Sequence, residues 1–154
     1  MTNAKDIVTA FMQALETKDF QAASSLLSDT FYFSGSMPQP LTGEQFINFF
    51  RELSAGIPNL SLHPRDIHDV EESEEGNRVD ATIQITGRQE NAINLYMLSL
   101  PIIPQLARSV SLSPEQWQFV VRDGLIAAID AEPTPGAGVA ELLHQLGVDA
   151  MMIQ

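Results

Sequence analysis

The spacing of apolar residues changes once along this chain of 154 residues, and the change restricts the fold more than any other feature. Before Pro58, apolar residues recur every three or four positions, which is typical of helices that bury one face. After Pro58 they alternate with polar residues, which is typical of strands that bury one face. Helices followed by a run of strands predict a single α+β domain, and we expect it to span residues 1–154.

Three helices are predicted in the first part of the chain. The first covers residues 4–15, with Thr2 and Asn3 as possible N-caps, and Asp19 can cap a shorter second helix. Thr42 and Gln45 have the spacing of a capping box, which predicts the start of a third helix. Between the second and third helices, the stretch TFYFSGSM has the aromatic and β-branched content of a strand.

The later strands are predicted to form a bent antiparallel sheet. In the stretch RVDATIQITG, Val79 and Ile83 belong to one face and alternate with polar residues. The apolar residues change phase near Pro64 and again near Pro114, which predicts two β-bulges. Bulges bend a sheet, so we expect the sheet to curve around the helices. The acidic run EESEEGN is interpreted as a solvated hairpin loop rather than a calcium loop, because it lacks the required alternation of carboxylates.

The composition excludes several classes of function. Twenty acidic residues against eight basic ones give a net charge of -12, which repels nucleic acids and anionic membrane surfaces. The chain has no cysteine, so it can have no disulfide, thiolate nucleophile or zinc–thiolate site. Its longest apolar stretch, INLYMLSLPIIP, is too short and too interrupted to cross a membrane. The N-terminus lacks the features of an export signal, so we expect a cytoplasmic protein.

The glycines of PTPGAGV could belong to a phosphate-binding loop before a helix, but the neighbouring residues do not fit. A Walker loop needs a lysine and a hydroxyl residue directly after its last glycine, and Gly138 is followed by Val139 and Ala140. The dinucleotide fingerprint needs a third glycine and a preceding parallel βαβ unit, which the pattern does not predict. We therefore interpret the segment as a strand exit followed by a short covering helix, and we predict no cofactor.

The histidines and serines form no recognisable catalytic pattern. His63 and His68 are five positions apart, so a regular strand places them on opposite faces, and we predict no metal site. The nucleophile-elbow signature GxSxG does not occur. Asp123 precedes Gly124 in a pair that is typical of hairpin turns, so we assign Asp123 no catalytic role.

Several stretches together resemble the SnoaL-like, or polyketide cyclase-like, branch of the nuclear transport factor two-like superfamily. They are GEQFINFFRELSAGIP, RVDATIQITG, the hairpin VVRDGLIAAI and the tail PGAGVAELLHQLGV, and with the three helices they cover almost the whole chain. The resemblance implies a cone of curved antiparallel sheet wrapped around N-terminal helices, with a short C-terminal helix. It also implies a pocket between the helices and the concave face, and a homodimer formed through the outer face. Because the family includes cyclases, dehydratases, isomerases, epoxide hydrolases and members without an assigned activity, the fold does not settle the function.

Two carboxylates near the end of the last predicted strand are candidates for acid–base chemistry. Asp130 and Glu132 share a face with Ile126 and Ala128. If this face points inward, Asp130 lies near the mouth of the cone, where desolvation would raise its pKa toward the range of a general base. The alternative is that Asp130 and Glu132 lie at a wet rim with no catalytic role.

Five aromatic residues are candidates to line a pocket. Tyr32 and Tyr96 carry hydroxyls that can orient a ligand carbonyl, while Phe49, Phe50 and Trp117 offer flat apolar walls. Each of the five can instead be a core residue.

Two functions from different classes remain open. The first is binding of a small apolar or carbonyl-containing molecule. The second is a lyase, isomerase or cyclase that uses no cofactor and in which Asp130 or Glu132 abstracts a proton next to a carbonyl. Against catalysis, Ala127, Ala128 and Ile129 make the centre of the last predicted strand apolar. In either case we expect a homodimer and no nucleic-acid or membrane partner.

Overall fold

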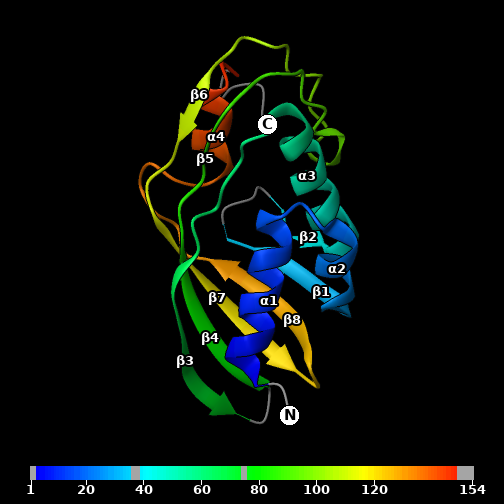
Figure 1. The fold of residues 1–154 in the computed structure, drawn as a ribbon, viewed down its shortest axis with the longest axis vertical. Coiled ribbons are helices and arrows are strands. Elements are labelled where there is room, and N and C mark those ends of the chain that lie inside the picture. Colours follow the sequence, from blue (N-terminus) through cyan, green and yellow to red (C-terminus); the bar gives the residue numbers. More distant parts are fainter. Residues whose placement is uncertain (1–2, 36–38, 74–75, 149–154) are drawn as a thin grey trace.

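The computed structural model describes residues 3–35, 39–73 and 76–148, and it confirms an α+β fold (Figure 1). Its helices are α1 (Ala4–Glu16), α2 (Phe20–Ser25), α3 (Gly43–Gly56), the short 3-10 helix η1 (Tyr96–Leu98) and α4 (Val139–Gln145). Its strands are β1 (Leu27–Ser34), β2 (Leu41–Thr42), β3 (Arg65–Ser73), β4 (Gly76–Ile83), β5 (Thr86–Arg88), β6 (Ser109–Ser111), β7 (Glu115–Arg122) and β8 (Leu125–Ala131).

The three predicted N-terminal helices are present, and side chains cap them as expected. Asn3 accepts a hydrogen bond from the backbone N–H of Asp6 at 2.8 Å, which begins α1. Asp19 caps α2 in the same way. Thr42 and Gln45 form the reciprocal capping box of α3, with each side chain accepting from the backbone N–H of the other residue. These caps satisfy N–H groups that a helix leaves without partners, so they fix where each helix begins.

The main sheet has six strands in the order β2-β1-β8-β7-β4-β3, and β5 and β6 form a separate two-stranded sheet. The neighbouring strands are antiparallel, as predicted, except that β1 and β8 run parallel. The expectation of a wholly antiparallel sheet is therefore wrong at this one pair. The parallel pairing is possible because β1 and β8 are joined by most of the chain rather than by a hairpin.

The two predicted bulges have different outcomes. β3 shifts register against β4 between Arg65 and His68, just after Pro64, so the first irregularity is present. Near Pro114 the chain does not bulge within one strand. Instead it leaves β6 in the small sheet and enters β7 in the main sheet. Pro114 has no N–H to donate, which suits a break between two strands better than a bulge within one.

The β7–β8 hairpin turns at Asp123 and Gly124, as predicted from the sequence. Both residues have positive φ, at 55° and 77°, which is the conformation of a type I′ turn. Arg122 pairs with Leu125 directly across this turn. The tight connection fixes the register of β7 and β8, and therefore decides which of their side chains face the helices.

The core lies between the helices and the inner face of the main sheet, and α1 crosses that face (Figure 1). Phe46 on α3 is fully buried at the centre of an aromatic cluster. Its ring centroid lies 4.9 Å from Phe33, 6.2 Å from Phe11 and 6.1 Å from Trp117. Aromatic pairs at such separations stabilise a core beyond the area that they bury. The middle of the cone is thus filled with side chains.

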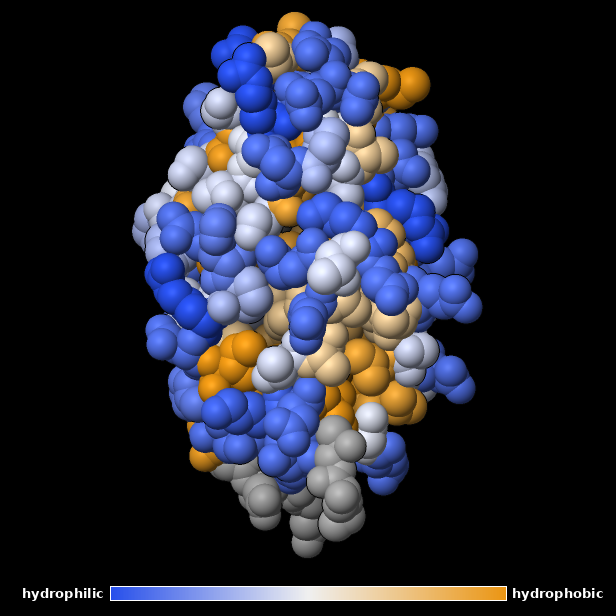
Figure 2. Space-filling view, in the orientation of Figure 1, coloured by the Kyte–Doolittle hydropathy of each residue, from blue (hydrophilic) through white to orange (hydrophobic). Residues whose placement is uncertain are grey.

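The segment between β5 and β6 exposes large apolar residues at the upper end of the molecule, where Figure 2 shows a few hydrophobic side chains among hydrophilic ones. Tyr96, Ile102 and Leu106 are each about half exposed or more. An antiparallel β-bridge between Ile93 and Ile103 joins the two sides of this segment. None of the helices in the described part of the chain has the length and apolar character needed to cross a bilayer.

Candidate functional site

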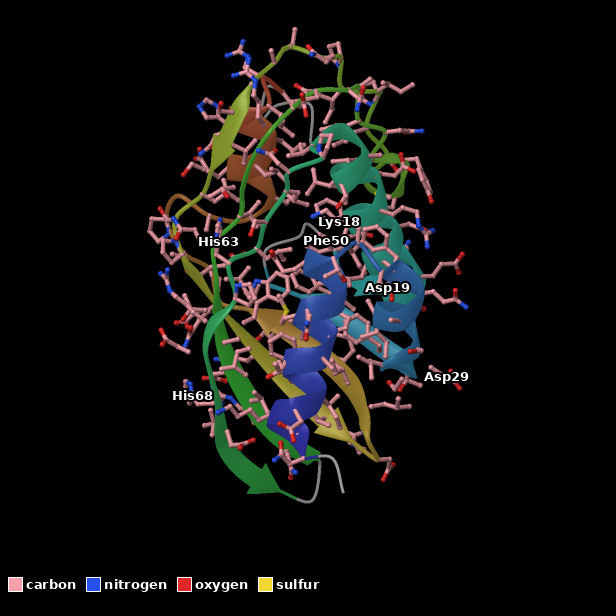
Figure 3. All side chains as sticks on the ribbon, viewed as in Figure 1. Lys18, Asp19, Asp29, Phe50, His63 and His68 are labelled. Carbon is pink, nitrogen blue, oxygen red and sulfur yellow. The ribbon has the colours of Figure 1, made fainter. Side chains whose placement is uncertain are left out.

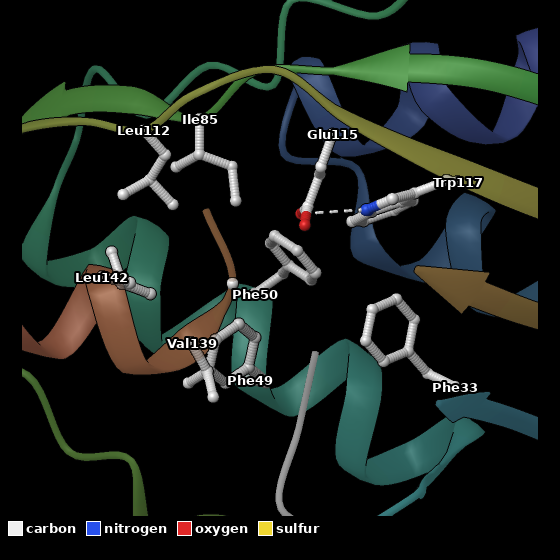
Figure 4. Close-up of a pocket in the computed structure, with 10 residues that line it drawn as sticks. Phe33, Phe49, Phe50, Ile85, Leu112, Glu115, Trp117, Val139 and Leu142 are labelled. Carbon is white, nitrogen blue, oxygen red and sulfur yellow. Dashed lines mark hydrogen bonds between the residues drawn. The ribbon is translucent and has the colours of Figure 1, made fainter. Parts of the chain in front are cut away.

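A small pocket lies between α3, the start of β7 and α4, next to the aromatic cluster (Figure 4). Its volume of about 20 Å³ is enough for about one water molecule. Nearly all of its lining side chains are apolar, and they come from six parts of the chain. They are Phe33, Phe49, Phe50, Ile85, Leu112, Glu115, Trp117, Gly138, Val139 and Leu142.

Helix α4 is held over the pocket by the glycine-containing segment and by one glutamine. Ser113 donates its backbone N–H to the carbonyl of Gly136 at 2.8 Å, and a Cβ at Gly136 would lie only 2.5 Å from the Ser113 hydroxyl. Gln145 pairs with both backbone groups of Ser111, at 2.7 and 3.1 Å. The predicted strand exit and covering helix are therefore confirmed, and α4 contributes Val139 and Leu142 to the lining.

Glu115 supplies the carboxylate of the pocket. It is only 5% exposed, and its Oε1 accepts a hydrogen bond from Trp117 Nε1 at 3.1 Å. Its Oε2 is buried and has no hydrogen-bond partner among the described residues. Figure 4 shows the carboxylate pointing into the space beside Phe50. A buried polar atom without a partner is costly in a native fold, so this oxygen is suited to meet a water molecule or a ligand.

The environment also changes the acidity of Glu115. Burial raises the pKa of the Glu115 carboxyl above its ordinary value of 4.5, and the hydrogen bond from Trp117 opposes this rise only in part. Among the described residues that line the pocket, Glu115 is the sole titratable one. Its carboxyl is thus able to hold a proton at a pH where exposed glutamates have lost theirs, which is the property of a general acid or base.

Sequence reasoning missed Glu115, although the pattern contains the signal that identifies it. Trp117, Phe119 and Val121 occupy alternate positions that belong to one face of a strand, and Glu115 continues the same alternation by one step. A carboxylate in phase with three apolar residues is predicted to be buried with them. Pro114 directly precedes Glu115, and the bulge predicted there hides the fact that Glu115 belongs to the same strand as Trp117.

The structure places Asp130 and Glu132 outside this pocket. Asp130 lies opposite Gln118 on β7, while its neighbour Ala131 lies opposite Trp117 on the core face. Asp130 is exposed and accepts a hydrogen bond from the Ser34 hydroxyl at 3.2 Å. The exposure of Asp130 agrees with the alternative of a wet rim and not with the inward orientation, because a one-residue offset in a strand reverses the face. Glu132 is also exposed, so a catalytic role for either residue stays a prediction without support from this pocket.

The five aromatic candidates separate into two groups. Phe49, Phe50 and Trp117 line the pocket, and they are also packed in the core. Tyr32 and Tyr96 are 50% and 52% exposed and do not line it. Tyr32 lies on the same face of the sheet as Asp130. Its partner on β8 is two residues before Asp130, and residues two apart in a strand share a face. Neither tyrosine hydroxyl is placed to orient a molecule beside Glu115.

His63 and His68 lie far apart along the β3 side of the sheet, and each makes its own hydrogen bond (Figure 3). Nε2 of His63 lies 2.7 Å from the Thr86 hydroxyl, and Nδ1 of His68 lies 2.6 Å from the carbonyl of Asp66. Across the described residues, no three histidine, aspartate or glutamate side chains are grouped in a way that could hold a metal ion.

Comparison with known proteins identifies the family of the domain. A model of the SnoaL-like domain matches residues 8–129, which is most of the chain. None of the curated proteins matches the chain.

Solved structures of similar fold cover nearly the whole chain at low sequence identity. A candidate polyketide cyclase from Xanthomonas campestris is 21% identical with a TM-score of 0.65, over 91% of this chain and 93% of that one. TsrD from Streptomyces laurentii is 21% identical with a TM-score of 0.67, over 97% and 99%. A protein with a ketosteroid isomerase-like fold from Catenulispora acidiphila, in complex with trimethylamine, is 16% identical with a TM-score of 0.64, over 97% and 98%. At these identities the similarity establishes the fold.

Proposed function

Because this chain belongs to the SnoaL-like family, we propose that it binds a small, largely apolar molecule in the pocket around Glu115. The observation that carries the proposal is the buried Oε2 of Glu115, which has no partner among the described residues and adjoins an otherwise apolar lining. Apolar walls with a single well-placed polar group are typical of sites for small molecules. The trimethylamine bound to the Catenulispora protein supports a small molecule as the ligand class.

The pocket must enlarge when a ligand enters, because its volume of about 20 Å³ is far below the roughly 300 Å³ of typical ligand sites. Helix α4 is the element best suited to move. It has only seven residues, and its N-cap residue is Gly138, which has no side chain to cap the helix. Displacement of α4 would withdraw Val139 and Leu142 from the lining while the six-stranded sheet stays intact.

A second candidate function is acid–base catalysis without a cofactor, with Glu115 in the role that the sequence suggested for Asp130. The raised pKa of Glu115 favours this candidate, since a carboxyl that titrates closer to neutral pH can accept and return a proton. In this role Glu115 would abstract a proton next to a ligand carbonyl. Trp117 would orient the carboxylate through the bond to Oε1 and leave Oε2 for the ligand.

Native mass spectrometry of the purified protein tests the binding proposal, with Glu115→Gln and Leu142→Ala as companions. We expect a co-purified small molecule on the wild type, reduced occupancy in Glu115→Gln, and stronger uptake of apolar probes by Leu142→Ala, because a truncated lining side chain leaves room. A protein that carries no molecule, and an enlarged pocket that takes up no probe, would contradict the proposal. Loss of turnover in Glu115→Gln with binding retained would favour the catalytic candidate.

We also propose that the protein forms a homodimer through the outer face of the main sheet. This face is polar but only partly exposed along β4 and β7, where the Thr82 hydroxyl donates to Gln116 at 2.9 Å and Asp80 is almost buried. Sedimentation at micromolar concentration should give a mass of about twice the 16.9 kDa chain. A single species with the mass of one chain would refute the dimer.

A further inference from the structure

Aromatic rings surround the Glu115 carboxylate. Phe33, Phe49, Phe50 and Trp117 all line the same pocket. The Trp117 ring lies 5.2 Å from Phe33 and 6.3 Å from Phe50, and Phe49 lies 5.2 Å from Phe50 at an interplanar angle of 89°. These rings therefore meet at different angles around the pocket that they line.

The faces of aromatic rings carry partial negative charge, and they attract organic cations when water is excluded. A carboxylate oxygen without a partner adds a full negative charge that can accept a hydrogen bond. We infer that this pocket takes a small apolar amine in its protonated form, whose N–H donates to Glu115 Oε2 while its alkyl groups contact the rings. This inference rests on the small-molecule binding proposed above and names its ligand class.

The hydrogen-bond donors of the lining favour an amine over a ligand that only accepts. Among the described lining side chains, Trp117 Nε1 is the sole donor apart from a protonated Glu115, and it already donates to Glu115 Oε1. Of these side chains, only a protonated Glu115 could therefore donate to a carbonyl ligand, whereas an ammonium group needs the ionised form. No cationic side chain among the described lining residues competes for the carboxylate, and the net charge of -12 attracts cations to the protein.

The two ligand classes must respond to pH in opposite directions. Glu115 is protonated at low pH because burial raises its pKa, so an amine cation has to displace that proton before it can pair with the carboxylate. Affinity for the amine then rises as the pH rises through the pKa of Glu115. Affinity for a carbonyl compound falls over the same range, since its donor is lost.

The experiment compares cyclohexylamine with cyclohexanone, which share a six-membered ring and differ in the polar group. The chain has one tryptophan, so the indole N–H resonance of Trp117 reports on this pocket without ambiguity in an NMR titration. We expect cyclohexylamine to bind about tenfold more tightly than cyclohexanone at pH 7.5, with an affinity that rises with pH until Glu115 is ionised. Glu115→Gln should abolish this preference, and Leu142→Ala should keep it while both compounds bind more tightly.

The possible outcomes separate the two proposals. If cyclohexanone binds as tightly as the amine, or if its affinity is the one that rises with pH, the amine inference is wrong and small-molecule binding stands. If neither compound shifts the resonance in the wild type or in Leu142→Ala, both proposals fail. A preference for the amine that persists unchanged in Glu115→Gln would also overturn the inference, because the carboxylate would then have no part in it.

Discussion

Among the residues whose burial the structure describes, each face of the main sheet buries one carboxylate, and the two differ in what compensates their charge. Asp80 on the outer face is 8% exposed and pairs with Arg78, whose Nε lies 3.1 Å from Oδ1. Glu115 on the inner face is 5% exposed and meets only the neutral indole of Trp117. The degree of burial is nearly the same, but only Asp80 has a cation beside it.

The difference between Asp80 and Glu115 shows that burial alone does not distinguish a functional carboxylate from a structural one. A buried charge with a paired cation is a stable structural element, whereas one without a cation stays costly until it is protonated or meets a ligand. Carboxyls with a perturbed pKa in a pocket are concentrated at functional sites, which is why we propose Glu115 as the centre of the site. The following predictions test this contrast between the inner and outer faces.

The largest effect should come from Trp117→Ala on the inner face. The substitution leaves a cavity where the buried indole ring was, and it removes the hydrogen-bond donor of Glu115. We therefore expect a loss of about 3–5 kcal/mol in the free energy of unfolding. Gln118→Ala, one position along β7 on the outer face, should cost less than about 1 kcal/mol. Chemical denaturation of both variants measures the difference, and similar losses would contradict the assignment of faces.

Glu115→Gln should stabilise the protein by about 1–2 kcal/mol at pH 8, because the amide keeps an acceptor for Trp117 but carries no charge to bury. The gain must depend on pH. Burial raises the folded-state pKa of Glu115, so its contribution to stability is fully present below 4.5 and is lost as the pH rises through the folded-state pKa. Denaturation curves from pH 4 to pH 8 should therefore converge at the acidic end. A gain that is constant with pH would show that the charge is not its cause.

Asp80→Asn is the matched substitution on the outer face, and its effect should have the opposite sign. It removes the charge that pairs with Arg78, and we expect a loss of about 1 kcal/mol or less because the Arg78 side chain is 34% exposed. Added salt should reduce the loss, since it screens the pair in the wild type. If Asp80→Asn stabilises the protein as Glu115→Gln does, the contrast between the two carboxylates is false.

The smallest effect should come from Asp130→Asn. Asp130 is exposed and its recorded contact is with the Ser34 hydroxyl, so the change in the free energy of unfolding should stay below about 0.5 kcal/mol. Binding to the Glu115 pocket should be unchanged, as measured by the same NMR titration. Weaker binding by the Asp130→Asn variant would support a functional role for Asp130.

Most of the fold could be predicted because local signals and the family resemblance agree. The caps at Asn3, Asp19 and Thr42 fix the helix starts, and the Asp-Gly pair at residues 123–124 fixes one hairpin. The parallel pairing of β1 with β8 had no local signal, since it joins strands that are far apart in the sequence. The hairpin loop predicted in the acidic run includes residues 74–75, which lie outside the described residues.

The site was harder to predict because it depends on the face that each strand turns inward. Trp117 and Glu115 follow one alternation and could have been assigned together. The orientation of Asp130 could not be read from β8 alone, because Ala127, Ala128, Ile126 and Ile129 are all apolar and mark neither face. Pairing of Trp117 with Ala131 decides the question, and pairing is a property of the folded sheet.

The parallel pair also has a consequence for how the chain is made. Leu27 and Ile126 are partners although roughly 100 residues separate them. The ribosome therefore synthesises most of the chain after β1 before β8 exists to pair with it. At about 5–20 residues per second, that interval is on the order of 5–20 seconds. During it, Phe33 lacks both its partner Ile129 on β8 and the Trp117 ring that finally lies 5.2 Å away, so apolar surface of β1 stays open to contacts with other chains.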